Sequence, residues 1–259
     1  MSSIDEVREI LDFATDIARE AGDLTLRHFG AVVAHDSKGD GTPVTIADRE
    51  AEQHLRRRIA ERFPDHGILG EEFGDANSDA RVRWVLDPID ATRSFMRGVP
   101  LYGVLIGVEV EGAPTVGVAH FPPLRETVAA GVGLGCTLNG EPCRVSETSS
   151  IEESLVLTTD VERILSGASG DGWRKLQQRA AFSRTWGDCY GHALVATGRA
   201  EVMVDPIQAP WDAGPFPVLI SEAGGRFSSL EGEWTMHGGS GISTNGVLHD
   251  EVLAALTAR

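Results

Sequence analysis

Apolar residues recur at helical spacing near the start of the chain and predict two amphipathic helices. Ser3 and Glu6 have the spacing of a capping box, and the apolar stripe that follows them continues to Ala21. A second stripe, over residues 47–59, ends before Pro64, which breaks helices. We expect the two helices to pair antiparallel and to cover a sheet.

Short β-rich runs follow these helices, and turn residues separate them. The runs expected to form a meander are 102–110, 115–121 and 125–130. Asn139-Gly140 then marks a tight hairpin turn. Later segments alternate between strand and helix: 154–157, 188–198, 201–204 and 213–223. This alternation is typical of α/β proteins, so we assign the chain to the α/β class.

The length and the linker pattern bear on domain organisation. At 259 residues the chain can bury a large core. We expect a single domain over residues 1–259, with a division into subdomains at about 1–145 and 146–259 as the alternative. The glycine-rich stretch 166–172 is expected to be a surface loop, because apolar periodic segments flank it closely.

Charge and cysteine content exclude several classes of protein. A formal net charge of −16 argues against binding to nucleic acid or to a membrane surface, because anionic phosphates repel an acidic body. The three cysteines lack Cys-x-x-Cys spacing and suggest neither a disulfide framework nor structural zinc. Neither a membrane-spanning apolar run nor a signal-peptide pattern is present. We therefore expect a cytoplasmic protein.

The most informative motif is Asp87-Pro88-Ile89-Asp90-Ala91-Thr92. It follows the apolar run 84–86, which predicts two carboxylates just beyond a buried strand, where open α/β sheets bind ligands. Pro88 favours an extended backbone at Asp87 and removes an amide donor. Hard oxygen ligands at this spacing suit Mg²⁺. A solvated turn is the alternative interpretation.

Acidic residues also lie at the ends of three other predicted elements. Glu71 and Glu72 end a short apolar strand, Asp212 precedes a predicted helix, and Asp48 lies in the first turn of the helix over residues 47–59. Each position alone is typical of a helix cap or a surface acid. Their shared location at element ends predicts that they converge on one site.

Competing chemistries leave no trace in the sequence. A dinucleotide fingerprint, a phosphate-binding P-loop, a nucleophile elbow, a His-Glu-x-x-His metal motif and the Cys-to-Arg spacing of cysteine phosphatases are all missing. The histidines show no metal-ligand spacing, so we expect His192, His237 and His249 to be structural or surface residues.

Taken together, the motifs resemble those of the inositol monophosphatase superfamily of Mg²⁺-dependent, lithium-sensitive phosphatases. The matching segments are Gly70-Glu71-Glu72, Asp87-Pro88-Ile89-Asp90-Ala91-Thr92, Trp211-Asp212 and Glu222-Ala223-Gly224-Gly225. The resemblance implies a layered αβαβα fold. Residues 84–95 and the run from Thr185 to Glu201 look most like the histidinol-phosphatase branch.

The resemblance also implies roles for individual residues. According to the resemblance, the side chains of four residues and the carbonyl of Ile89 would bind two or three Mg²⁺ ions. The four are Glu71, Asp87, Asp90 and Asp212. Thr92 would orient the attacking water with help from Glu71 and Asp48, and the amides of Ala91 and Thr92 would hold phosphate. Lys38 could add charge to an active-site flap, and a solvated loop lysine is the alternative interpretation.

Two departures from the family pattern affect the phosphate side. Ala91 stands where the superfamily usually has glycine, so a positive φ there would cost on the order of 1 kcal/mol. After Asp212, Pro215 and Pro217 replace small residues. Pro215 fits a first helical turn, whereas Pro217 is expected to tighten or kink it.

Substrate choice would depend on residues that face away from the phosphate. Family correspondence places Asp188 and Asp205 beside the alcohol portion of the substrate. Two acids there suit the cationic amino and imidazole groups of L-histidinol phosphate, a metabolite of histidine biosynthesis, better than a neutral polyol. Inositol-1-phosphate or a related sugar or nucleotide phosphate is the alternative substrate. A catalytically weak regulator that binds phosphorylated metabolites is the non-enzymatic alternative. The expected partners are a small phosphorylated metabolite and a second copy in a homodimer, without nucleic acid or membrane.

Overall fold

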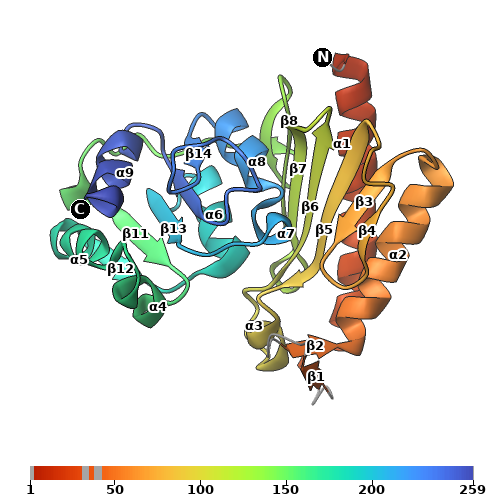
Figure 1. Ribbon diagram of the computed structural model, residues 1–259, viewed down its shortest axis with the longest axis horizontal. Coiled ribbons are helices and arrows are strands. Elements are labelled where there is room, and N and C mark those ends of the chain that lie inside the picture. Colours follow the sequence, from red (N-terminus) through yellow and green to blue (C-terminus); the bar gives the residue numbers. More distant parts are fainter. Residues whose placement is uncertain (1–2, 31–34, 38–42, 259) are drawn as a thin grey trace.

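Two β-sheets organise the protein, and helices lie outside and between them (Figure 1). The structure is a computed structural model that describes residues 3–30, 35–37 and 43–258. The layers run helix, sheet, helix, sheet, helix, which confirms the expected αβαβα architecture. Within these described ranges, helices that combine the length and the apolar character needed to cross a membrane are absent.

The first sheet has eight strands in the order β10-β9-β8-β7-β6-β5-β3-β4. Its members are β3 (Gly67–Gly70), β4 (Gly74–Ala76), β5 (Val82–Asp90), β6 (Gly103–Val110), β7 (Ala113–Phe121), β8 (Glu126–Gly131), β9 (Gly135–Leu138) and β10 (Glu141–Pro142). Neighbours are antiparallel except β3 and β5, which run parallel. The predicted meander forms the centre of the sheet, and Asn139-Gly140, both at positive φ, turns β9 into β10.

Helices α1 (Ile4–Leu26) and α2 (Ile46–Arg62) cover the outer face of the first sheet (Figure 1). Ser3 Oγ accepts a hydrogen bond from the Glu6 amide at 3.1 Å, and Thr45 with Asp48 forms a complete capping box. The apolar stripes pack onto β5, β6 and β7 in one core cluster, as the periodicity predicts. The strand pair β1 (His35–Ser37) and β2 (Pro43–Thr45) lies between the two helices in the chain.

The second sheet has five strands in the order β12-β11-β13-β15-β14. They are β11 (Leu155–Thr158), β12 (Phe182–Arg184), β13 (Val202–Asp205), β14 (Arg226–Ser228) and β15 (Gly241–Thr244). The first three strands of this order are parallel, and β15 is antiparallel to both β13 and β14. The predicted alternation of strand and helix therefore produces the parallel part of the sheet.

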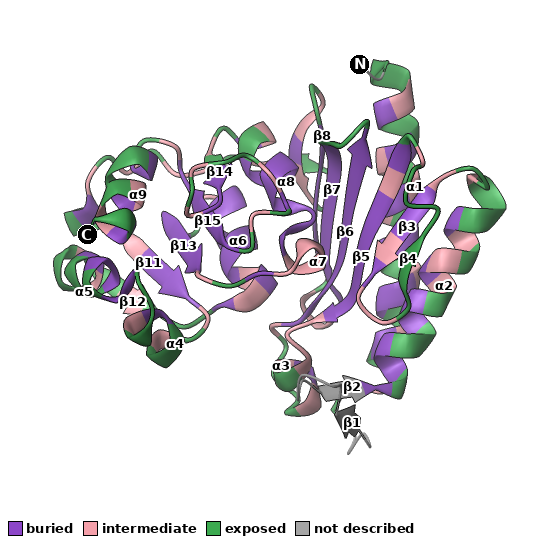
Figure 2. Ribbon diagram, in the orientation of Figure 1, coloured by how far each residue is buried: buried purple, intermediate pink, exposed green. Residues whose placement is uncertain are grey.

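The remaining helices cover the second sheet on both sides (Figure 1). The outer ones are α4 (Val161–Ser166), α5 (Gly170–Arg179) and α9 (His249–Thr257), and those between the sheets are α6 (Asp188–Ala196), α7 (Pro210–Ala213) and α8 (Phe216–Glu222). The short elements are α3 (Thr92–Met96), η1 (Pro122–Leu124) and η2 (Ile151–Glu153). Figure 2 shows that both sheets are largely buried, while exposed residues gather on the outer helices.

The stretch 166–172 departs from the sequence prediction. Ser166 ends α4, residues 167–169 form a tight turn, and Gly170 and Gly172 are buried residues of α5 rather than part of a surface loop. A Cβ on Gly170 would lie 2.3 Å from the Leu165 carbonyl oxygen, and one on Gly172 would lie 2.0 Å from that of Ala255. These glycines therefore allow close helix packing, which local composition does not distinguish from flexibility.

Prolines and glycines together fix the segment that carries Asp212. Pro215 caps α8 and Pro217 lies in its first turn, so the chain forms two short helices instead of one kinked helix. A Cβ on Gly107 of β6 would meet the Gly214 oxygen at 2.5 Å, and one on Gly117 of β7 would meet the Pro215 oxygen at 2.3 Å. Glycine in the two strands thus lets this segment approach the first sheet.

Candidate active site

The first acidic motif lies within the end of β5, not beyond the strand as the sequence predicted. The pairing of β5 with β6 shifts between Asp87 and Asp90, so a bulge interrupts the regular alternation of side chains. Pro88, inside the bulge, has no amide to pair. The Ile89 amide donates to Asp87 Oδ1 at 3.0 Å. The bulge therefore redirects the end of the strand and lets both carboxylates reach one site.

Asp212 approaches the same place from α7. Its Oδ2 accepts a hydrogen bond from the Ala209 amide at 2.9 Å, so the carboxylate caps the helix that contains it. Carboxylate oxygens of Asp87, Asp90 and Asp212 all lie within 4.8 Å of one another. Three acids separated by up to 125 positions in the chain thus form one cluster of oxygen donors.

Glu71 and Asp48 lie at the border of this cluster. Glu71 follows β3, and its amide donates to the Leu86 oxygen at 3.2 Å, which places it beside Asp87. Asp48 is buried, and its Oδ2 accepts from the Thr45 amide at 2.8 Å and from the Thr45 hydroxyl at 2.5 Å. Asp48 Oδ1 is a buried oxygen without a hydrogen-bond partner among the described residues.

The electrostatics of the cluster favour a bound cation. Burial raises the pKa of Asp87 and of Asp90 well above the ordinary value for aspartate, and neighbouring carboxylates raise it further. Burial likewise raises the pKa of Asp212 and of Asp48 to about 6, and the charge of Glu71 adds to both shifts. A divalent metal would stabilise these oxygens as anions, so the donor set fits a hard ion such as Mg²⁺.

Ala91 and Thr92 connect β5 to α3. Ala91 has φ 66° and ψ 46°, in the left-handed region that favours glycine, so the positive φ considered from the sequence is present. Thr92 begins α3, and its hydroxyl donates to the Ile89 oxygen at 3.2 Å. The Ile89 carbonyl and the Thr92 hydroxyl are therefore direct neighbours.

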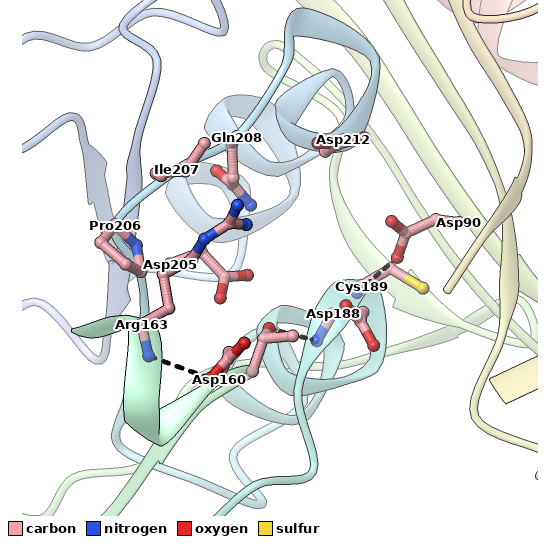
Figure 3. Close-up of a pocket in the computed structure, with 11 residues that line it drawn as sticks. Asp90, Asp160, Arg163, Asp188, Cys189, Asp205, Pro206, Ile207, Gln208 and Asp212 are labelled. Atoms are coloured by element: carbon pink, nitrogen blue, oxygen red, sulfur yellow. Dashed lines mark hydrogen bonds between the residues drawn. The ribbon is translucent and has the colours of Figure 1, made fainter. Parts of the chain in front are cut away.

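A pocket of about 160 Å³ opens beside the acidic cluster (Figure 3). Residues from both halves of the chain line it: Asp90, Thr159, Asp160, Arg163, Asp188, Cys189, Asp205, Pro206, Ile207, Gln208 and Asp212. The structure thus brings Asp188 and Asp205 together with two members of the cluster, Asp90 and Asp212. Asp48, Glu71, Ala91 and Thr92 are not among the lining residues.

Asp188 and Asp205 reach the pocket from the second sheet and its inner helix. Asp188 begins α6 at φ 49°, and its amide donates to Thr159 Oγ1 at 2.7 Å. The next amide, of Cys189, donates to Asp90 Oδ2 at 2.7 Å and so ties α6 to β5. Burial raises the pKa of Asp188 to about 7, and the charges of Asp205 and Asp212 add to the shift. Asp205 ends β13.

Sequence reasoning missed the pocket wall at the start of α4. Asp160 Oδ1 accepts from the Arg163 amide at 3.0 Å and caps this helix, and the side chains of both residues line the pocket. Their position directly after β11, a parallel strand, is a signal that could have identified them, because ligands bind at the carboxyl ends of parallel strands.

Glu52, which lies outside the pocket, was also missed by sequence reasoning. Its side chain is fully buried and accepts hydrogen bonds from the amides of Glu72 at 2.7 Å and Phe73 at 3.2 Å. The Arg56 Nε donates to it at 2.7 Å. Glu52 therefore holds the turn that follows Glu71. A carboxylate on the same helix face as Asp48, four residues later, was the available signal.

The histidines have different surroundings. His237 bonds to Glu109 Oε1 at 2.8 Å, and His249 lies between the hydroxyls of Ser228 and Thr244, in keeping with the structural role expected for them. His192 is also buried, yet its Nε2 lies 3.3 Å from Oδ2 of the pocket residue Asp205. Lys38 lies outside the described residues.

The chain is similar to known proteins along nearly its whole length. The model of the inositol monophosphatase family matches residues 6–259. The chain is 45% identical to a histidinol-phosphatase of Chlorobaculum parvum over 95% of this chain and 96% of that protein. It is 38% identical to a histidinol-phosphatase of Mycobacterium tuberculosis, over 96% and 98% of the two chains. The solved structure of a Thermotoga maritima IMPase superposes with a TM-score of 0.87 at 30% identity, covering 96% of each chain. The chain therefore belongs to the inositol monophosphatase family, a family of phosphatases.

Proposed function

We propose that the protein is a Mg²⁺-dependent phosphomonoesterase that hydrolyses L-histidinol phosphate to L-histidinol and phosphate in the cytoplasm. The observation that carries this proposal is the convergence of Asp87, Asp90 and Asp212 beside a pocket whose wall also holds Asp188 and Asp205. One end of the pocket suits a metal-bound phosphate, and the other end suits a cationic alcohol.

The residues present fit a metal centre. Asp87, Asp90 and Asp212 would hold two or three Mg²⁺ ions, with Glu71 and the Ile89 carbonyl completing the donor set. When bound, Mg²⁺ supplies positive charge that polarises the phosphate, acidifies a water molecule and neutralises the leaving alkoxide. The mutual repulsion of these buried carboxylates supports this assignment, as does Asp48 Oδ1, which has no hydrogen-bond partner in the part of the chain that the structure describes.

Other side chains would orient the reacting groups. The Thr92 hydroxyl, which lies 3.2 Å from the Ile89 oxygen, would direct the attacking water, with Glu71 and Asp48 as acceptors. The amides of Ala91 and Thr92 would bind phosphate oxygens. The Cys189 amide already donates to Asp90, which fixes that carboxylate for its role.

Charge in the pocket supports a cationic leaving group. Away from the acidic cluster, the wall carries Asp160, Asp188 and Asp205 against Arg163, so carboxylates outnumber the cation. The amino and imidazole groups of histidinol would offset this excess. The two histidinol-phosphatase relatives support the same substrate.

Inositol-1-phosphate is the second candidate substrate. The 30% identity to an IMPase structure favours it, and Asp205 can accept hydrogen bonds from polyol hydroxyls. A third candidate, a catalytically weak regulator, is favoured only by Ala91 at the phosphate side. A homodimer remains our expectation for the assembly.

A substrate panel tests the proposal. The wild-type kcat/KM for L-histidinol phosphate should exceed that for inositol-1-phosphate by at least about 10²-fold, the scale of one or two desolvated charge contacts. Combining Asp188→Asn with Asp205→Asn should erode this ratio, whereas the exposed Asp171→Asn should preserve it. Salt should raise KM for histidinol phosphate through screening. Equal or better turnover of inositol-1-phosphate would refute the histidinol assignment.

A further inference from the structure

His192 stands behind Asp205 and cannot reach the substrate. Its side chain is fully buried on α6 and stacks on Phe216 with a ring separation of 4.5 Å. It is not among the residues that line the pocket. Both ring nitrogens nevertheless have polar neighbours: Nδ1 lies 2.7 Å from Ser243 Oγ, and Nε2 lies 3.3 Å from Asp205 Oδ2.

Hydrogen-bonding chemistry selects one tautomer of this ring. A carboxylate oxygen only accepts, so Nε2 must carry the proton that it donates to Asp205 Oδ2. In the neutral ring Nδ1 is then an acceptor, and the Ser243 hydroxyl donates to it. Ser243, His192 and Asp205 thus form a directed chain of hydrogen bonds that runs from β15 through α6 to the end of β13.

Gln208 closes the same network. Its Nε2 lies 2.9 Å from His192 Nε2, which would oppose two donors, while its Oε1 is buried without a hydrogen-bond partner among the described residues. Exchanging the amide nitrogen and oxygen removes the opposition of two donors, because the oxygen then accepts from His192. The exchanged amide nitrogen takes the place of the unpartnered oxygen. His192 Nε2–H is therefore shared between Asp205 and Gln208, two residues of the pocket wall.

We propose that His192 is a positioning residue for substrate specificity: anchored by Ser243, it engages Asp205 Oδ2 and so holds the Asp205 carboxylate ready for the alcohol portion of the substrate. This inference rests on the proposed function. Figure 3 shows Arg163 extending from α4 toward Asp205 and Gln208. Without His192, the Asp205 carboxylate is free to turn toward that guanidinium and leave the substrate position.

Substitutions at position 192 separate hydrogen bonding from packing. His192→Phe keeps a ring against Phe216 but removes both hydrogen bonds, and His192→Gln restores an N–H near the position of Nε2. The readout is kcat/KM for the preferred large phosphate ester, histidinol phosphate or inositol-1-phosphate, divided by kcat/KM for methyl phosphate. Methyl phosphate does not extend to Asp205, so the ratio cancels any general loss of active enzyme.

We expect His192→Phe to lower this ratio by at least about 10-fold, mainly through KM, because a binding contact is lost. His192→Gln should recover it to within about 3-fold of the wild type. His249→Phe is the matched control, since His249 is equally buried and bonds two hydroxyls but no carboxylate. The control should keep the wild-type ratio even where its melting temperature falls.

The possible outcomes distinguish a failure of the role proposed for His192 from a failure of the proposed function. An unchanged ratio in folded His192→Phe overturns the positioning role. If that variant does not fold, Ser243→Ala replaces it: a drop in the ratio of about 3-fold or more supports the chain of hydrogen bonds, and an unchanged ratio overturns it. Wild-type protein that hydrolyses no ester would instead refute the proposed function, before any variant is measured.

Discussion

Replacing Glu52 by glutamine should weaken both the fold and metal binding, although Glu52 touches neither pocket nor cluster. Its carboxylate accepts two backbone hydrogen bonds from residues 72 and 73 and pairs with Arg56 at 2.7 Å. These contacts hold the turn beside Glu71. Glu52→Gln keeps the size of the side chain but removes the charge and converts one acceptor oxygen to a donor.

The magnitude follows from the burial of the pair. The Glu52 side chain is 0% exposed and that of Arg56 is 18% exposed, so solvent screens their interaction weakly. Hydrogen bonds to a charged group contribute roughly 1.5–3 kcal/mol, and breaking a buried ion pair costs roughly 3–5 kcal/mol. Because glutamine retains one acceptor, we expect a loss of about 2–4 kcal/mol in the free energy of unfolding.

Two assays measure the effects of Glu52→Gln. Urea denaturation gives the change in the free energy of unfolding, and phosphate release against Mg²⁺ concentration gives the half-saturating concentration. We expect the latter to rise about 10-fold or more, the usual effect of losing a residue that orients metal ligands. Glu50→Gln is the matched control, because Glu50 lies on the same helix with a 47% exposed side chain.

Small effects would refute this reasoning. If Glu52→Gln lowers the free energy of unfolding by less than about 0.5 kcal/mol, the Glu52–Arg56 pair does not stabilise the fold to the extent that its burial implies. If stability falls but the Mg²⁺ requirement is unchanged, Glu52 supports the helix alone and does not position Glu71. If Glu50→Gln shows the same loss of stability and the same rise in the Mg²⁺ requirement, both effects result from the changed net charge of the helix and not from the contacts of Glu52.

Three further predictions concern Thr92, Ala91 and His249. Thr92→Ala should lower kcat by at least about 10²-fold with little change in KM, and an unchanged kcat in steady-state assays would reduce Thr92 to the start of α3. Ala91→Gly should keep or raise kcat. It should change the free energy of unfolding by no more than about 1 kcal/mol, because relief of the left-handed backbone strain opposes the larger backbone entropy that glycine loses on folding. A loss of activity in this variant would show that the phosphate site is built differently. Burial lowers the pKa of His249 to about 4. Between pH 6.5 and 4, the unfolded chain therefore binds a proton at this residue that the folded protein does not bind. The free energy of unfolding should fall as the pH falls through this range. Urea denaturation across this range should show a shallower pH dependence in His249→Phe, and equal slopes would contradict the assigned pKa.

Much of the fold was predictable because its signals are local. The stripes of α1 and α2, their caps at Ser3 and Thr45, and the Asn139-Gly140 turn depend on neighbours within a few residues. The two glycines of α5 were misassigned because their function is set by partners far away in the chain. Gly172, for example, packs against Ala255 of α9, which its own neighbourhood does not reveal.

The candidate site divides in the same way. The acidic motifs identified Asp87, Asp90 and Asp212, and the structure brings these three together. The roles assigned to Thr92, Asp188 and Asp205 stay predictions. Asp160 and Glu52 were missed because their importance depends on what the tertiary fold places against them: a pocket in one case and a pair of backbone amides in the other.

The most direct test of the central claim is phosphate release from histidinol phosphate before and after metal removal. The claim is that Asp87, Asp90, Asp212 and Glu71 bind Mg²⁺ for hydrolysis, so chelator should abolish turnover and added Mg²⁺ should restore it. Asp212→Asn, checked for folding by its melting temperature, should lose several orders of magnitude in kcat even at saturating Mg²⁺. Full turnover by the wild-type enzyme in excess chelator would contradict the claim.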